Sequence, residues 1–106
     1  MSANITMHEL YERNANLGQN EIILDVRTAE EYREGHIHGS INIDHGSIAS
    51  HASELKKYDK VYIHCKMGGR AAKAFESLLS AGLTNLVCVS DGGMQAWIEA
   101  GYPVEK

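Results

Sequence analysis

The sequence predicts an α/β fold in which helices cover both faces of a central, mostly parallel sheet. Apolar, β-branched runs of strand length alternate with segments of helical periodicity, which is the pattern of successive strand–helix units. The run at 22–26, Ile-Ile-Leu-Asp-Val, is almost continuously apolar, as in a strand that is buried on both faces. Between the early strands, Thr is twice followed three positions later by Glu, which marks a helix start.

Two capping boxes locate the helices in the first half of the chain. Thr6 with Glu9 begins the first helix, and Thr28 with Glu31 begins a shorter one that Gly35 ends. The strands of this half are expected from Ile5, at 22–26 and at 41–43.

The second half continues the alternation around a central strand. Residues 44–53 are polar without a strong period, so we expect a loop that merges into a helix ending near Tyr58. Further elements are expected as a strand at 60–64, a helix at 70–81, a strand at 86–89, a turn at 90–93 and a last helix at 94–100. The apolar stripe expected on the 70–81 helix consists of Ala71, Ala74, Phe75, Leu78 and Leu79.

Composition favours one globular domain. The chain has 106 residues, 43% of them hydrophobic and 23% charged, which is ordinary for a globular protein. A net charge of −4 gives no support to a nucleic-acid partner, and no apolar run is long enough to span a membrane. The first residues lack the pattern of a signal peptide, and two cysteines are too few for a disulfide framework, so a cytoplasmic location is expected.

Residues 61–75 contain the strongest indication of chemistry. An apolar strand ends at Cys65, and Lys66, Met67, Gly68, Gly69 and Arg70 follow before an alanine-rich helix. In an open parallel sheet, ligands bind outside the carboxyl ends of the strands. Backbone N–H groups at a helix start, together with two cations, favour an oxyanion and favour the thiolate of Cys65, which is the nucleophilic form. Gly68 and Gly69 are expected to allow positive φ and close approach to a ligand. A buried structural cysteine beside an ordinary turn is the alternative.

Three motifs, in order along the chain, resemble those of rhodanese-like domains. The first comprises residues 24–27 (Leu-Asp-Val-Arg), 31–32 (Glu-Tyr) and 35–43 (Gly-His-Ile-His-Gly-Ser-Ile-Asn-Ile). The second is residues 62–65 (Tyr-Ile-His-Cys) with Gly68 and Arg70, and the third is residues 92–97 (Gly-Gly-Met-Gln-Ala-Trp) with 101–104. The resemblance implies one rhodanese-like domain over residues 5–105, with a three-layer fold.

The resemblance also implies a thiosulfate sulfurtransferase. Proteins of this family move a sulfane sulfur from a donor such as thiosulfate to a thiophilic acceptor, cyanide or a thiol, through a cysteine persulfide. Carried over, Cys65 is the nucleophile, residues 66–70 form the cradle and Arg70 is its closing cation. The implied partners are a small anionic donor and a thiol or cyanide acceptor, including a protein thiol, and no metal or organic cofactor is required.

Asp25 and Arg27, which lie outside the loop, are expected to support it, with a direct catalytic role as the alternative. Asp25 is expected to accept N–H groups that fix the loop, and Arg27 either pairs with Glu31 or faces the pocket. His64 precedes the nucleophile, but neighbouring residues on a strand point to opposite faces, so it is a weak general-base candidate. Cys88 lies within an apolar strand and is expected to be a buried small hydrophobe, with a resolving cysteine as the alternative.

Other functions of this scaffold remain as alternatives. Cysteine phosphatases and arsenate reductases resemble Cys-x5-Arg, whereas the spacing from Cys65 to Arg70 is one residue shorter. A non-enzymatic module commonly lacks the cysteine that is present here, and a sulfur relay would use a protein thiol as acceptor. Six histidines show no familiar metal-ligand spacing, so no metal site is expected.

Overall fold

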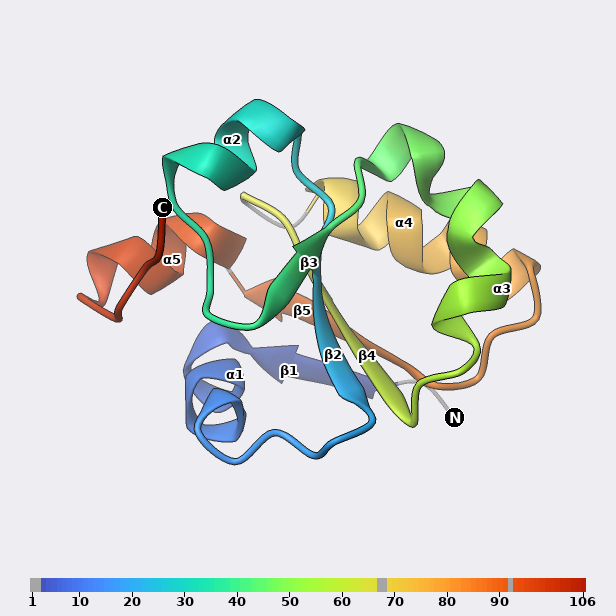
Figure 1. Cartoon of the computed structure of the whole chain (residues 1–106), viewed down its shortest axis with the longest axis horizontal. Helices are drawn as coiled ribbons and strands as arrows, with labels where there is room; N and C mark the ends of the chain where they lie inside the picture. The colour runs from blue at the N-terminus through green and yellow to red at the C-terminus, as the bar shows by residue number, and fades with distance from the viewer. Residues whose placement is uncertain (1–2, 67–68, 92) are drawn as a thin grey trace.

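A five-stranded parallel sheet forms the centre of the protein in the computed structural model, which describes residues 3–66, 69–91 and 93–106. The strands are β1 (Ala3–Thr6), β2 (Glu21–Asp25), β3 (Ser40–Asn42), β4 (Lys60–His64) and β5 (Leu86–Asp91). Their spatial order is β1-β5-β4-β2-β3, and every strand pair is parallel. The predicted α/β class is confirmed, and the sheet proves to be entirely parallel (Figure 1).

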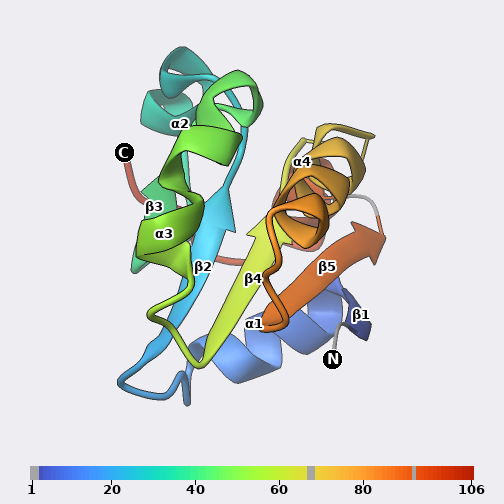
Figure 2. The same ribbon diagram turned by 90° about the vertical axis from the view of Figure 1, so that its right-hand side faces the viewer.

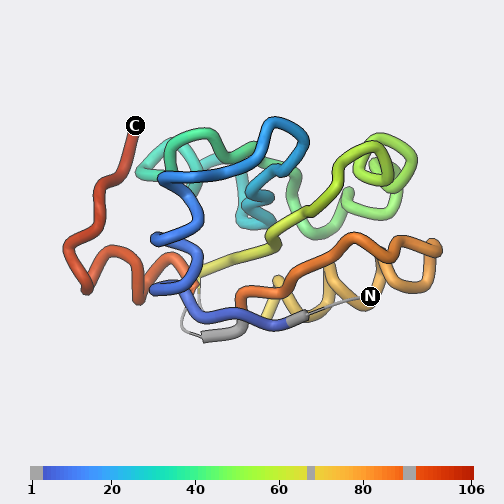
Figure 3. Tube along the Cα trace, turned by 90° about the horizontal axis from the view of Figure 1, so that it is seen from below, coloured from blue at the N-terminus to red at the C-terminus, as the bar shows by residue number. Residues whose placement is uncertain are grey.

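Helices cover both faces of the sheet, as predicted. The helical elements are α1 (Met7–Asn14), α2 (Ala29–Glu34), the 3₁₀ helix η1 (His45–His51), α3 (Ala52–Leu55), α4 (Gly69–Ser80) and α5 (Gly93–Glu99). One buried cluster joins the sheet to η1, α3 and α4, and a second joins it to α1 and α5. Figure 2 shows α4 and α1 separated by the sheet, and Figure 3 shows α1 beside α5, with which it is in contact.

The structure contains both of the capping boxes that the sequence predicted. At both Thr6 and Thr28 the side chain accepts the backbone N–H of the third helical residue, and the Glu at that position accepts the backbone N–H of the Thr. These capping boxes satisfy N–H groups that the helix itself leaves unpaired. They therefore fix where α1 and α2 begin.

Three expectations about the elements were wrong. Residues 45–51 form the 3₁₀ helix η1 rather than a loop, with the side chain of Asp44 accepting the N–H of Gly46 at its start. The strand expected to end at 89 continues to Asp91, so residues 90 and 91 of the expected turn belong to β5. Leu79 is 42% exposed, so it does not belong to the buried stripe of α4.

The order of the strands places the loops after β2 and β4 at one edge of the sheet. From β2 the chain proceeds outward to β3, whereas from β4 it proceeds to β5 on the other side. A reversal of this kind opens a crevice at the carboxyl ends of the two strands, where ligands of open α/β sheets bind. Among the described residues no helix is long and apolar enough to cross a membrane.

Candidate active site

Cys65 follows directly after the central strand β4 and is only 1% exposed. Its Sγ accepts the backbone N–H of Ala71, at 3.2 Å, from the first turn of α4. α4 is 12 residues long, so its N-terminus contributes partial positive charge at this sulfur. The cysteine thus occupies the place where a negative sulfur is stabilised by the fold itself.

The loop that follows Cys65 is only partly described. Lys66 is exposed, whereas Met67 and Gly68, both predicted to bind substrate, lie outside the described residues. Gly69 is the first residue of α4 and does not have a positive φ, and a Cβ there would meet nothing within 4 Å. The expected positive φ is therefore not found at Gly69, whereas its close approach to a ligand stays a prediction.

Two backbone hydrogen bonds from α5 hold the start of the loop, and the sequence did not predict this contact. The backbone N–H groups of Met94 and Gln95 donate to the carbonyls of Cys65 and Lys66, at 2.7 and 3.0 Å. Gly93 has φ +51°, and a Cβ there would lie 2.2 Å from the carbonyl oxygen of Cys65. The signal in the sequence is the Gly-Gly pair at 92–93, which indicates a turn and belongs to the third motif but does not reveal a contact with Cys65.

Arg70 is anchored to α2 through Glu31. The two guanidinium nitrogens of Arg70 donate to the two carboxylate oxygens of Glu31, at 2.6 and 3.0 Å. This bond to Arg70 is the main cause that lowers the pKa of Glu31 to about 2, with the N–H of Thr28 contributing. The bond also raises the pKa of Arg70, to which the nearby charge of Cys65 adds. The predicted closing cation is therefore held by a carboxylate from another element.

Glu31→Gln is expected to reduce the loss of stability in acid. Because the carboxyl pKa is about 2 in the folded protein and about 4.5 otherwise, its stabilisation is complete above pH 4.5 and is lost as the pH falls towards 2. Gln can still close the capping box but carries no charge. Urea unfolding between neutral pH and pH 2 measures the effect. Glu30→Gln, at an exposed position of the same helix, is the control, and equal acid sensitivity of the two variants would contradict the ion-pair assignment.

Asp25 and Arg27 form a buried ion pair beside the loop. Nε of Arg27 lies 2.9 and 3.0 Å from the two carboxylate oxygens of Asp25, and an Nη lies 2.7 Å from one of them. The backbone N–H of Arg27 also donates to Asp25, and the same guanidinium reaches the carbonyl of Gly35 at 2.7 Å. Such a pair is tolerated in the interior because its hydrogen bonds are satisfied. Asp25 accordingly binds Arg27, and within the described part of the loop no N–H group donates to its carboxylate; Arg27 does not pair with Glu31.

His64 lies beneath this pair on the sheet face opposite Cys65. It is fully buried, its Nε2 is 3.9 Å from a carboxylate oxygen of Asp25, and Nδ1 is 3.5 Å from the carbonyl of Cys65. Burial lowers the pKa of His64, with the charge of Asp25 acting in the opposite direction. A neutral imidazole facing away from the sulfur makes a poor base for it.

Cys88 shares a sheet face with Cys65. It pairs in register with Ile63, two residues before Cys65, so the two cysteines extend to the same side. Cys88 is 5% exposed, burial raises its pKa, and the charge of Cys65 raises it further. The two cysteines form no disulfide with each other.

Cys88→Ser is expected to leave sulfur transfer within about twofold of the wild type, per folded molecule, since a buried thiol of raised pKa is a weak nucleophile. Some stability is lost because a hydroxyl replaces the buried sulfur. Initial rates and urea unfolding on the same preparation separate the two effects. Loss of activity with the fold intact would show that Cys88 resolves an intermediate on Cys65.

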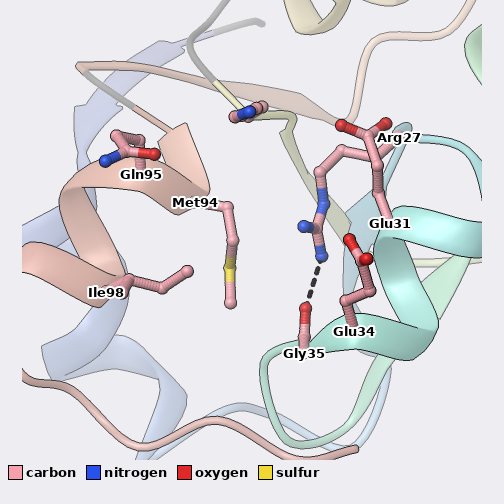
Figure 4. A pocket seen from close by; sticks show the side chains of 8 residues that line it. Arg27, Glu31, Glu34, Gly35, Met94, Gln95 and Ile98 are labelled. Carbon is pink, nitrogen blue, oxygen red and sulfur yellow. Dashed lines mark hydrogen bonds between the residues drawn. The ribbon is translucent and has the colours of Figure 1, made fainter.

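A pocket of about 240 Å³ opens between α2 and α5, next to the start of the loop. Its lining residues are Arg27, Glu31, Glu34, Gly35, Lys66, Met94, Gln95 and Ile98. Figure 4 shows Met94 and Ile98 extending from α5 into the space that faces Arg27 and Glu34. The structure therefore brings Arg27, Lys66 and Glu31 to one cavity, as a site at the carboxyl edge of the sheet requires. Arg27 facing the pocket was one of the two alternatives considered from sequence.

Comparisons with known proteins identify the family. The Rhodanese-like domain family matches residues 6–100. Thiosulfate sulfurtransferase 16, chloroplastic, of Arabidopsis thaliana is 33% identical over 94 residues, which cover 77% of this chain and 78% of that protein. Bacillus subtilis YrkF is 33% identical over 89 residues, which cover 84% of this chain, so the chain spans about half (48%) of that relative.

A solved structure agrees over nearly the whole chain. The rhodanese-related protein of Thermoplasma volcanium superposes with a TM-score of 0.82 at 38% identity, covering 97% of both chains. In this chain an entirely parallel sheet and three motifs that resemble those of rhodanese-like domains occur together. The chain belongs to the rhodanese-like family, whose compared relatives include sulfurtransferases.

Proposed function

We propose that the protein is a thiosulfate sulfurtransferase that transfers a sulfane sulfur through a persulfide on Cys65. The Cys65 thiolate attacks the outer sulfur of thiosulfate or a related donor, the donor S–S bond breaks, and sulfite leaves with the electron pair. The acceptor, cyanide or a thiolate, then attacks the outer sulfur of the persulfide and returns Cys65 as a thiolate. Two displacements replace one difficult transfer, and neither needs a metal or organic cofactor.

The observation that carries this proposal is the N–H of Ala71 directed at the Sγ of Cys65. A helix N-terminus that donates to the sulfur stabilises the thiolate in both the resting and the leaving state. Lys66 and Arg70 add positive charge for an anionic donor, and Met67, Gly68 and Gly69 complete the proposed cradle. Arg27 supports it by lining the adjacent wall of the pocket, and Asp25 supports it by holding Arg27 in place.

The spacing of the loop argues against the phosphatase and arsenate reductase alternative. Those enzymes resemble Cys-x5-Arg, whereas four residues separate Cys65 from Arg70. We propose sulfur transfer in the cytoplasm by one domain covering residues 5–105, with a small thiol or a protein thiol as the acceptor.

Intact-protein mass spectrometry after incubation with thiosulfate tests the proposed function. The wild type is expected to gain the mass of one sulfur atom, and cyanide is expected to remove it with release of thiocyanate. Cys88→Ser is the control and should gain the same mass. If neither protein gains sulfur while both remain folded, Cys65 is not a persulfide carrier and the proposal is wrong.

A further inference from the structure

The pocket between α2 and α5 has features that identify the acceptor class, an inference that rests on the proposed sulfur transfer. The pocket adjoins the nucleophile, because Lys66 follows Cys65 and the N–H groups of Met94 and Gln95 hold the carbonyls of residues 65 and 66. A molecule in this pocket therefore lies beside residues that hold the backbone of Cys65 in place.

The charges that line the pocket fall into two groups. Arg27 is neutralised by Asp25, and Glu31 by Arg70. Glu34 and Lys66 are both exposed, and the described part of the chain offers neither of them an ion-pair partner. One uncompensated carboxylate and one uncompensated ammonium thus face the same cavity.

The remaining wall of the pocket is apolar. Met94 is buried, and Ile98 is 54% exposed although it is a large hydrophobic residue. Both extend from α5 towards the polar wall formed by Arg27 and Glu34 (Figure 4). An aliphatic stem would cover the exposed part of Ile98 and remove apolar surface from water.

We propose that this pocket binds a zwitterionic thiol of amino-acid type as the sulfur acceptor. Its ammonium group pairs with Glu34, its carboxylate with Lys66, and its methylene stem lies against Met94 and Ile98. The carboxylate of Glu34 repels a small dianion such as thiosulfate, so the pocket suits the acceptor better than the donor. The acceptor thiolate attacks the outer sulfur of the Cys65 persulfide, the S–S bond to Sγ breaks with its electron pair on Sγ, and the acceptor leaves as a persulfide.

The test separates donor from acceptor by preparing the persulfide first. Protein is loaded with thiosulfate, freed of excess donor and mixed with one of four thiols, and loss of the added sulfur is followed by mass spectrometry. L-cysteine carries both charges, cysteamine only the ammonium, 3-mercaptopropionate only the carboxylate, and 2-mercaptoethanol neither. Each rate is expressed as the ratio of wild type to variant, so the intrinsic reactivity of each thiol cancels.

Glu34→Gln is expected to slow transfer to L-cysteine and cysteamine by about three- to fivefold, the range of a partly exposed ion pair, and to leave the other two thiols unchanged. Lys66→Gln is expected to slow transfer to L-cysteine and 3-mercaptopropionate instead. Glu30→Gln, an exposed carboxylate of the same helix outside the pocket, is expected to change none of them.

Equal ratios for all four thiols in Glu34→Gln, or the same pattern in Glu30→Gln, would overturn the acceptor assignment while leaving the persulfide chemistry in place. Failure of the wild type to load sulfur is a different result, which removes the proposed function and the acceptor assignment with it.

Discussion

Cys65→Ser is expected to abolish sulfur transfer while the protein remains folded. A serine hydroxyl is largely un-ionised at neutral pH and cannot carry a persulfide, so the rate of thiocyanate formation from thiosulfate and cyanide should fall by at least about 10³-fold. The substitution is nearly isosteric, and the serine oxygen can still accept the N–H of Ala71 that Sγ accepts at 3.2 Å. The free energy of unfolding is therefore expected to stay within about 1.5 kcal/mol of the wild type.

Cys88→Ser provides the matched control for this variant. It makes the same chemical change at the second buried cysteine, on the same face of the sheet. Activity should be lost at position 65 and retained at position 88. A folded Cys65→Ser protein that keeps more than a few per cent of the activity would mean that another group accepts the sulfur.

Features that depend on neighbouring residues could be predicted from the sequence. Both capping boxes lie within four residues, and the structure has them where the spacing indicated. The strand expected at 60–64 is β4 with the same limits, since a β-branched run with few polar residues has little alternative in a parallel sheet. The position of Cys65 at the carboxyl edge followed from this strand.

Features that depend on distant residues could not be predicted in the same way. From the sequence, Glu31 is a capping residue and a candidate partner for Arg27, but nothing relates it to Arg70, 39 positions away. Asp25 and Arg27 are two positions apart, yet their pairing depends on how the chain turns after β2. The 3₁₀ helix at 45–51 has no apolar period of its own and is held against α4 by tertiary contacts. The sequence therefore identified the site residues one by one, whereas which of them pair with each other could be seen only in the folded structure.

The contact between Gly93 and the loop could not be predicted from the sequence, and it is the place where one added methyl group should have the largest effect. At φ +51° any other L-residue is strained, at a cost of about 1–2 kcal/mol. A Cβ would also lie 2.2 Å from the carbonyl oxygen of Cys65 and 2.6 Å from that of Lys66, both of them backbone atoms. Neither oxygen can move away without breaking its hydrogen bond from Met94 or Gln95.

Gly93→Ala is accordingly expected to lower the free energy of unfolding by about 3 kcal/mol or more, as strain and steric overlap combine. Sulfur transfer per folded molecule should fall by about 10²-fold, since a shift of the order of 1 Å at Cys65 misplaces the nucleophile. Urea unfolding and single-turnover sulfur loading measure the two effects. Gly101→Ala is the matched control, because Gly101 has φ +79° but a Cβ there would meet nothing within 4 Å. If the two variants lose equal stability and both keep full activity, the loop is not held by its contact with α5. If Gly93→Ala alone loses more stability and also loses activity, the start of α5 sets the position of the nucleophile.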